Sequence, residues 1–186
     1  MNNNKGENNM TTTKTDALSN LQFKDNKGDG GGNFIKFTAG QSVKLRVFTT
    51  NPTIHINNYG KEQISFAVWN WDEDKAMILS KGPSIARQIS ALHQDDDFGA
   101  DITKVDIKIL ATGESMDREY AINVLPKAAD ISDAQLEALK ELDAKLGTIF
   151  KGSVRAEEYN NGIKPQVFGE GGEVIDDPIQ LNEMPF

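Results

Sequence analysis

Two tryptophans and several basic side chains are the residues of this chain whose types and spacing best suit a chemical task. Trp69 and Trp71 lie in an alternating stretch, so both side chains point away from the apolar face of a strand. Lys44, Arg46 and Phe48 occupy the polar-side positions of another such strand. Cations that track phosphates and rings that stack on bases are what binds single-stranded nucleic acid. We therefore predict a nucleic-acid contact surface from Lys44, Arg46, Phe48, Trp69 and Trp71, with Tyr59 and Lys61 in the loop between the two strands.

A purely structural explanation of the same pattern stays open. Trp69 and Trp71 would then be covered by a second helix or by the ends of the chain, because an exposed apolar surface of that size normally needs covering. Basic residues that alternate with apolar ones are also typical of any half-exposed strand. Exposure of the tryptophans separates the two explanations.

Enzymatic chemistry is not favoured. The chain has no cysteine, and its two histidines, His55 and His93, are not accompanied by a nucleophile motif. The acidic runs 72–74 and 95–97 lack the ligand spacing of a calcium loop, and the glycine runs 28–32 and 169–172 lack the context of a phosphate-binding loop. We expect no enzymatic activity, no metal and no cofactor.

The order of the expected elements indicates a fold. Alternation predicts strands at 42–48, 63–71 and 76–79, then a helix at 83–92 that begins at Pro83, then strands at 105–110 and 118–125. A helix between the third and fourth of five strands is the order of the oligonucleotide-binding (OB) barrel. We predict a mainly β protein with this five-stranded OB-fold barrel.

A second helix is expected at 132–146. Ser132 and Gln135 have the spacing of a capping box, and Gly147 is a typical stop. The helix has an apolar stripe that should pack on the outside of the barrel, formed by Leu136, Leu139, Leu142 and Leu146. A last strand-like stretch, 162–168, follows it.

The two ends of the chain differ in composition from residues 34–164, which we interpret as the folded domain. Residues 1–33 are rich in Asn, Thr and Gly and indicate a disordered arm. Residues 165–186 hold five acidic and no basic side chains, so they contribute −5 of the net charge of −8. This composition predicts a solvated acidic tail. Its Phe186 ring and α-carboxylate suit capture by a partner, so the predicted partner-binding residues are Asp176, Asp177, Glu183, Pro185 and Phe186.

The start of the chain lacks the apolar run of a signal peptide, and no stretch has membrane-spanning length. We therefore expect a cytoplasmic protein without a membrane partner.

Several short segments together resemble a known family. Four segments are similar, in this order, to segments of tailed-bacteriophage single-stranded-DNA-binding proteins. They are Lys81-Gly82-Pro83 at the start of a helix, Gly99-Ala100-Asp101-Ile102, Asp106-Ile107 in a strand and Arg118-Glu119-Tyr120 in another strand. The Pro185-Phe186 ending resembles the acidic tails of bacterial single-stranded-DNA-binding proteins, although those place aspartates closer to the tip.

The resemblance implies an OB-fold protein that coats single strands during phage replication or recombination in the host cytoplasm, with possible self-association on DNA. It adds Lys75 and Arg118 to the DNA-binding set and implies replication and recombination proteins as partners of the tail. A rival interpretation is a protein-interaction adaptor with the same barrel, or an acidic mimic of DNA that inhibits host factors. Burial of Trp69 and Trp71 under the second helix would favour the adaptor.

Overall fold

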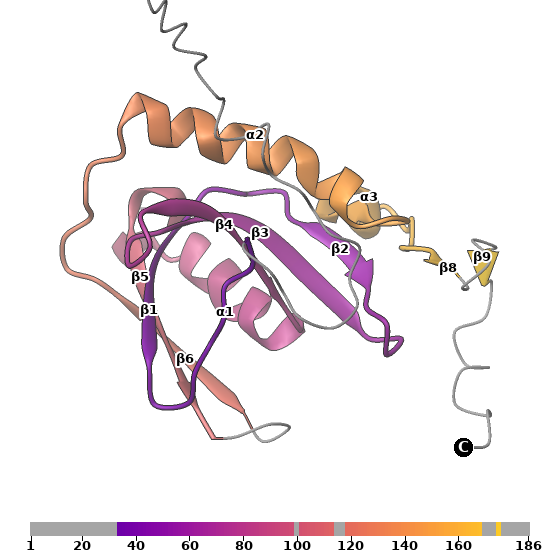
Figure 1. Ribbon diagram of the computed structural model, residues 1–186, viewed down its shortest axis with the longest axis horizontal. Helices are drawn as coiled ribbons and strands as arrows, with labels where there is room; N and C mark the ends of the chain where they lie inside the picture. Colours follow the sequence, from indigo (N-terminus) through magenta and orange to yellow (C-terminus); the bar gives the residue numbers. More distant parts are fainter. Residues whose placement is uncertain (1–32, 99–100, 114–117, 169–173, 176–186) are drawn as a thin grey trace, which may run out of the picture.

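The computed structural model describes residues 33–98, 101–113, 118–168 and 174–175, and it is mainly β (Figure 1). The strands are β1 (Ser42–Val47), β2 (Thr53–Ile56), β3 (Glu62–Asn70), β4 (Lys75–Lys81), β5 (Asp106–Thr112), β6 (Glu119–Val124), β7 (Val154–Arg155), β8 (Val167–Phe168) and β9 (Val174–Ile175). The α-helices are α1 (Pro83–His93), α2 (Asp133–Ile149) and α3 (Ala156–Asn160), and short 3-10 turns lie at Asp96–Phe98 and Ile102–Lys104.

The main sheet is antiparallel and has the order β6-β5-β1-β3-β2-β7, with β4 also paired to β3. The expected five strands are present as β1, β3, β4, β5 and β6. Their order in the sheet is β4-β3-β1-β5-β6, so β4 and β6 lie at its two ends. The stretch around His55, which the prediction left out of the five strands, forms β2 and continues the pairing of β1 along β3.

The main core lies on one face of this sheet, as the alternation predicted. Leu45 and Val47 of β1 are fully buried there beside Phe66 and Val68 of β3. Helix α1 closes the same core with Ile85 and Ile89, and it begins at Pro83 as expected. The alternating pattern therefore assigned the inward-facing side chains correctly.

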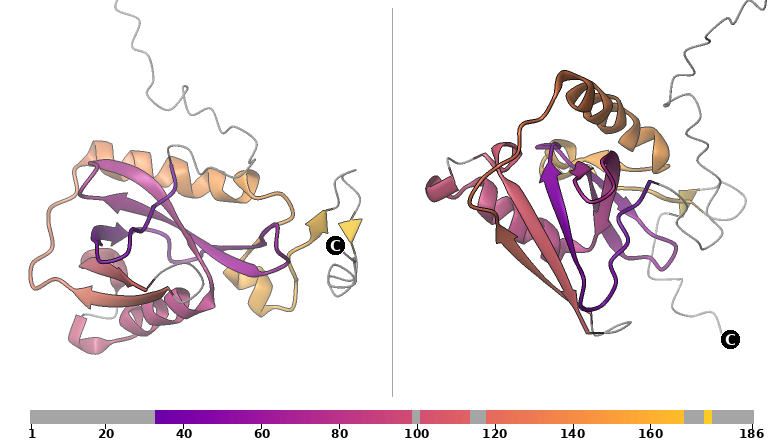
Figure 2. Two further views of the ribbon diagram at one scale, coloured as in Figure 1. Left: turned by 60° about the horizontal axis from the view of Figure 1, so that its bottom comes forward. Right: turned by 60° about the vertical axis from the view of Figure 1, so that its left-hand side comes forward.

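Helix α2 packs on the opposite face of the sheet from α1, which confirms the predicted position outside the main core (Figure 2). Leu142 and Leu146 contact Ala67 of β3 and Ile78 of β4 in a second, smaller cluster. The predicted capping box is present, because the Ser132 side chain accepts from Gln135 N and the Gln135 side chain accepts from Ser132 N.

The predicted end of α2 at Gly147 is wrong. The helix runs on to Ile149, because Ile149 and the following Phe150 pack against the second cluster and extend the apolar stripe past the glycine. The predicted strand at 162–168 is also shorter than expected: only Val167 and Phe168 are strand, paired with β9. Between α2 and β8 the chain forms β7 and α3, which the sequence pattern did not predict.

Candidate nucleic-acid interface

Three of the predicted DNA-binding side chains gather around one buried carboxylate. Asp106 Oδ1 accepts from Arg46 Nε at 2.8 Å and from Trp71 Nε1 at 2.9 Å. Lys44 Nζ lies 3.4 Å from the other oxygen of Asp106 and 5.2 Å from the Trp71 ring centroid. The structure therefore brings these side chains together, as the predicted surface requires, but around an internal anion.

The expectation that Arg46 projects from an open face is wrong. Its residue exposure is 6%, and its guanidinium also donates to Ala129 O at 2.9 Å while Ala129 N donates to Asp106 Oδ2. The connection between β6 and α2 thus passes over the outer side of β1 and covers it. Lys44 keeps 34% of its side chain exposed, so it retains access to solvent that Arg46 lacks.

Trp69 and Phe48 are also covered, contrary to the prediction. Trp69 is 6% exposed and lies on the face of β3 shared with Ala67, over which α2 packs. Phe48 packs, half-buried, against the same second cluster. Trp71 is half-buried and meets Trp69 edge to face, with ring centroids 6.5 Å apart. The structural alternative, a covered side chain, therefore holds for Trp69, which lies on the sheet face against which α2 packs.

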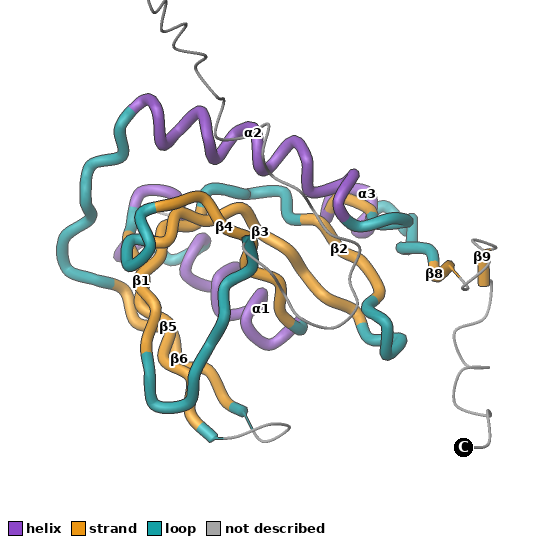
Figure 3. The backbone as a smooth tube through the Cα atoms, viewed as in Figure 1, coloured by secondary structure: helices purple, strands orange, loops and turns teal. Residues whose placement is uncertain are grey.

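Among the predicted site residues that the structure describes, Tyr59 is the aromatic one that is well exposed, at 85%. It lies in the β2–β3 turn, which projects at one end of the sheet (Figure 3). The Asn57 side-chain oxygen accepts from Tyr59 N at 2.9 Å and from Lys61 N at 3.0 Å, and Gly60 takes the positive φ of 69° that closes the turn. Asn57 therefore orders the backbone that presents both the Tyr59 ring and the exposed Lys61.

A second cation near this turn was not found from the sequence. Tyr159 of α3 donates to Glu62 Oε1 at 2.7 Å, directly beside Lys61, and Lys164 Nζ lies 3.8 Å from the Tyr159 ring centroid. Tyr159 and Glu62 are 97 positions apart in the chain. No local pattern indicates it.

The remaining two predicted residues lie apart from the turn. Lys75, the first residue of β4, is paired with Glu73 at 2.6 Å. Arg118 donates to Phe37 O at 3.0 Å at the start of β6 and is half-buried. Asp176, Asp177, Glu183, Pro185 and Phe186 lie outside the described residues.

Three polar residues on the outer face of the β2–β3 pair were not predicted as site residues. Thr53 and Ser65 face each other in register and are fully buried, and His55 lies two positions along β2 at 7% exposure. Burial removes the His55 ring from water, which disfavours the imidazolium and lowers its pKa from 6.5 to about 4. The ring of Phe150 stacks on His55.

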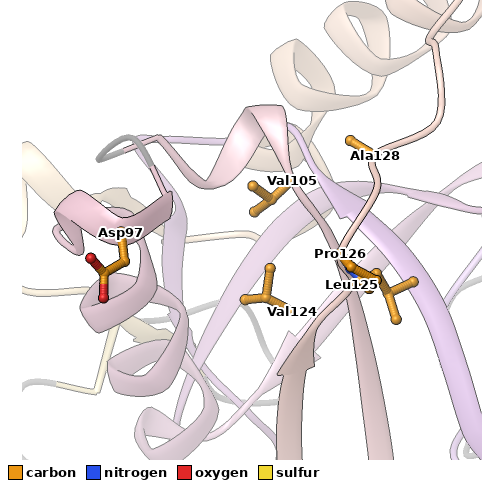
Figure 4. A pocket seen from close by; sticks show the side chains of 6 residues that line it. All are labelled: Asp97, Val105, Val124, Leu125, Pro126 and Ala128. Carbon is orange, nitrogen blue, oxygen red and sulfur yellow. The ribbon is translucent and has the colours of Figure 1, made fainter.

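The groove shown in Figure 4 has a different character. It has a volume of about 430 Å³ and is lined, apart from the Asp97 carboxylate, by apolar side chains: Val105, Val124, Leu125, Pro126 and Ala128. One carboxylate without a second titratable group gives it no acid–base pair. Among the described residues, no group of three or more His, Cys, Asp or Glu side chains is placed to hold a metal ion.

The part of the chain that the structure describes includes no helix with the length and apolar character needed to cross a bilayer. No protein-family model matches the chain, and neither the curated proteins nor the solved structures that were compared with it give a match.

Proposed function

We propose that this protein binds single-stranded DNA without sequence preference, through the β2–β3 turn that presents Tyr59 and Lys61. The observation that carries the proposal is Tyr59, a ring 85% exposed on a turn ordered by Asn57. An exposed ring next to Lys61 offers a base a stacking partner and its phosphate a cation. Lys164, on the neighbouring Tyr159, adds a second positive charge.

The arrangement of strands supports an OB barrel. β1 and β2 both pair with β3, so together they serve as one bent first strand, and the β2–β3 turn is then the loop between the first two barrel strands. That loop is one of those with which OB folds bind oligonucleotides. Lys81 of β4 lies 5.0 Å from the Phe37 ring and 5.3 Å from the Tyr120 ring of β6, so side chains connect the two end strands as a partly open barrel requires.

The wider role we propose is coating of single strands during phage replication or recombination, without catalysis. The acidic segment 165–186 would recruit replication or recombination proteins through its carboxylates and its aromatic end. The residues proposed to contact these partners are Asp176, Asp177, Glu183, Pro185 and Phe186.

The test is the affinity for fluorescein-labelled oligothymidine, measured by anisotropy at low and moderate salt. Because one base–aromatic stack is worth about 1–3 kcal/mol, Tyr59→Ala should weaken binding by about 5- to 150-fold. Lys61→Ala should reduce the slope of log affinity against log salt by about 0.7. Both variants should unfold at the wild-type temperature, since the side chains are exposed.

Ile163 provides the matched control. It is the other large apolar residue that is well exposed among the described residues, at 53%. Ile163→Ala should bind oligothymidine like the wild type. If Tyr59→Ala also binds like the wild type, the turn is not the contact surface and the proposal fails.

A protein-interaction adaptor is the second candidate, and the burial of Trp69 under α2 favours it. In that case the exposed Tyr59 would contact a partner protein. The two functions differ in their response to salt and ligand: an adaptor has no affinity for oligothymidine at low salt, where phosphate contacts are strongest.

A further inference from the structure

Unpaired polar atoms concentrate on one face of the β2–β3 pair. Thr53 Oγ1, Ser65 Oγ and His55 Nδ1 are buried without a hydrogen-bond partner, and so is Trp69 Nε1 further along the same face of β3. These are four of the five such atoms among the described residues, the fifth being on Arg118. The four residues are 0 to 7% exposed.

This concentration is unusual for a structural interface. Buried polar atoms are nearly always paired, and each one left without a partner destabilises the folded state. Thr53 and Ser65 face each other across the strands, with His55 two positions away, so the atoms form a continuous strip. A planar ligand with donors and acceptors along its edge would satisfy groups that the protein itself leaves unpaired.

Phe150 covers the His55 end of the strip in a geometry that resembles a stacked base. Its ring lies 3.8 Å from the His55 ring, centroid to centroid, with an angle of 12° between the planes. Phe34 meets Phe150 edge to face at 6.1 Å. A phenyl ring supplies the stacking but no hydrogen-bonding group, whereas a nucleobase supplies both. The site as built therefore suits a base better than it suits Phe150.

The polar contacts that anchor α2 to the sheet lie away from Phe150. The helix is held further back, where Asp143 Oδ1 accepts from Thr49 Oγ1 at 2.7 Å and Arg155 Nη2 donates to Asp143 O. Phe150 follows the last helical residue and is tied to the helix by its backbone N–H to Leu146 O at 3.3 Å. Displacement of its ring from His55 would break the packing of the ring against Phe34 and the second cluster, but would leave the contacts of Asp143 intact.

We propose that Thr53, His55 and Ser65 form a base-binding site that Phe150 closes in the free protein, and that a base of the bound strand replaces the Phe150 ring on His55. This inference rests on the proposed binding of single-stranded DNA and deepens it. The strand contacts Tyr59 in the turn of the same β2–β3 hairpin, four positions along the chain from His55. Phe150 lowers the affinity in the free protein, because binding must first displace it.

The experiment compares oligothymidine binding by the full-length wild type, Phe150→Ala, His55→Ala and Ile149→Ala. Phe150→Ala removes the competing ring and should tighten binding by about tenfold, the effect of one base stack. His55→Ala removes the stacking partner of the base and should weaken binding by about tenfold. Ile149→Ala is the matched control, because it loosens the same end of α2 without removing the ring on His55. It should bind like the wild type.

An abasic oligomer of equal length tests whether a base is responsible. Wild type and Phe150→Ala should bind it equally, because it has phosphates but nothing to stack. Phe150→Leu keeps apolar volume over the strip without the parallel ring, so it replaces Phe150→Ala if circular dichroism shows that the alanine variant is unfolded. It should also bind oligothymidine more tightly than the wild type.

Each contrary result has a distinct meaning. If the wild type binds oligothymidine in a Tyr59-dependent way while the Phe150 and His55 variants bind equally well, the base site is wrong and the proposed function stands. An equal gain by Ile149→Ala, or a gain for the abasic oligomer, also overturns the base site. If none of the proteins binds oligothymidine, both the proposed function and this inference fail.

Discussion

Asp106 is the residue around which Lys44, Arg46 and Trp71 gather, and it shows how one buried charge redirects its neighbours. A buried carboxylate is stable only when it is paired and hydrogen-bonded. Asp106 is fully buried and accepts from a guanidinium, an indole N–H and the backbone of Ala129. Side chains that satisfy this anion contribute to holding the fold, and Arg46 in particular is not free to bind phosphate.

His55 leads to a prediction about pH. Its pKa falls from 6.5 to about 4 on folding, so the unfolded chain binds the proton first as the pH decreases. The contribution of the neutral ring to stability is complete above pH 6.5 and is lost as the pH falls towards 4. Between pH 7 and 5 the wild type should lose about 2 kcal/mol more unfolding free energy than His55→Phe.

Urea unfolding of both proteins at the two pH values measures this difference. Groups that titrate elsewhere in the chain are common to both proteins and cancel in the comparison. An equal loss of stability in wild type and variant would mean that the folded protein admits the imidazolium.

At the scale of elements, helix α2 covers the outer face of the sheet. Leu142 and Leu146 supply apolar contact with Ala67 and Ile78, and Asp143 supplies a polar anchor. Thr49, which donates to Asp143, also accepts from Ala67 N at 2.7 Å, so the anchor reaches the backbone of β3. Helix and sheet are thus joined by both apolar and charge-assisted contacts.

We predict that Asp143→Ala lowers the free energy of unfolding by about 1.5–3 kcal/mol, the usual worth of a hydrogen bond to a charged group. Glu141 is the control on the same helix, because it is half-exposed and its nearest cation, Lys145, lies 3.8 Å away. Glu141→Ala should change the stability by less than about 1 kcal/mol. Urea titration monitored by circular dichroism tests both, and similar losses in the two variants would argue against the anchor.

At the scale of the whole molecule, charge is distributed unevenly. Residues 165–186 hold five acidic side chains and no basic ones, and the net charge of the chain is −8. A linked acidic segment competes with phosphates for the same cations at a high effective concentration, and salt screens that competition.

We predict that deletion of residues 169–186 tightens binding of oligothymidine at low salt and has little effect at moderate salt. A full-length variant with Asn or Gln in place of the five acidic residues should behave like the deletion, because it removes the charge and keeps the length. Anisotropy titrations at the two salt concentrations make the comparison. Equal affinities of wild type and deletion at low salt would contradict the competition.

Local patterns were enough to predict most elements and their inward faces. The alternation of β1 and β3 identified Leu45, Val47, Phe66 and Val68 as core, because one face of a half-buried strand must be apolar. The start of α2 was equally predictable, since the Ser132–Gln135 capping box acts within one helical turn. These features depend on neighbours in sequence, so the sequence alone determines them.

What covers the outer faces was decided only by tertiary structure. Arg46 and Asp106 are 60 positions apart, and His55 and Phe150 are joined across most of the domain. The sequence pattern of a strand is the same whether solvent, a connecting segment or a helix lies above its polar side. The candidate site therefore lies at the Tyr59 turn and at the part of the outer face beneath Phe150 instead of at the tryptophans, because long-range packing determines which side chains a ligand can reach.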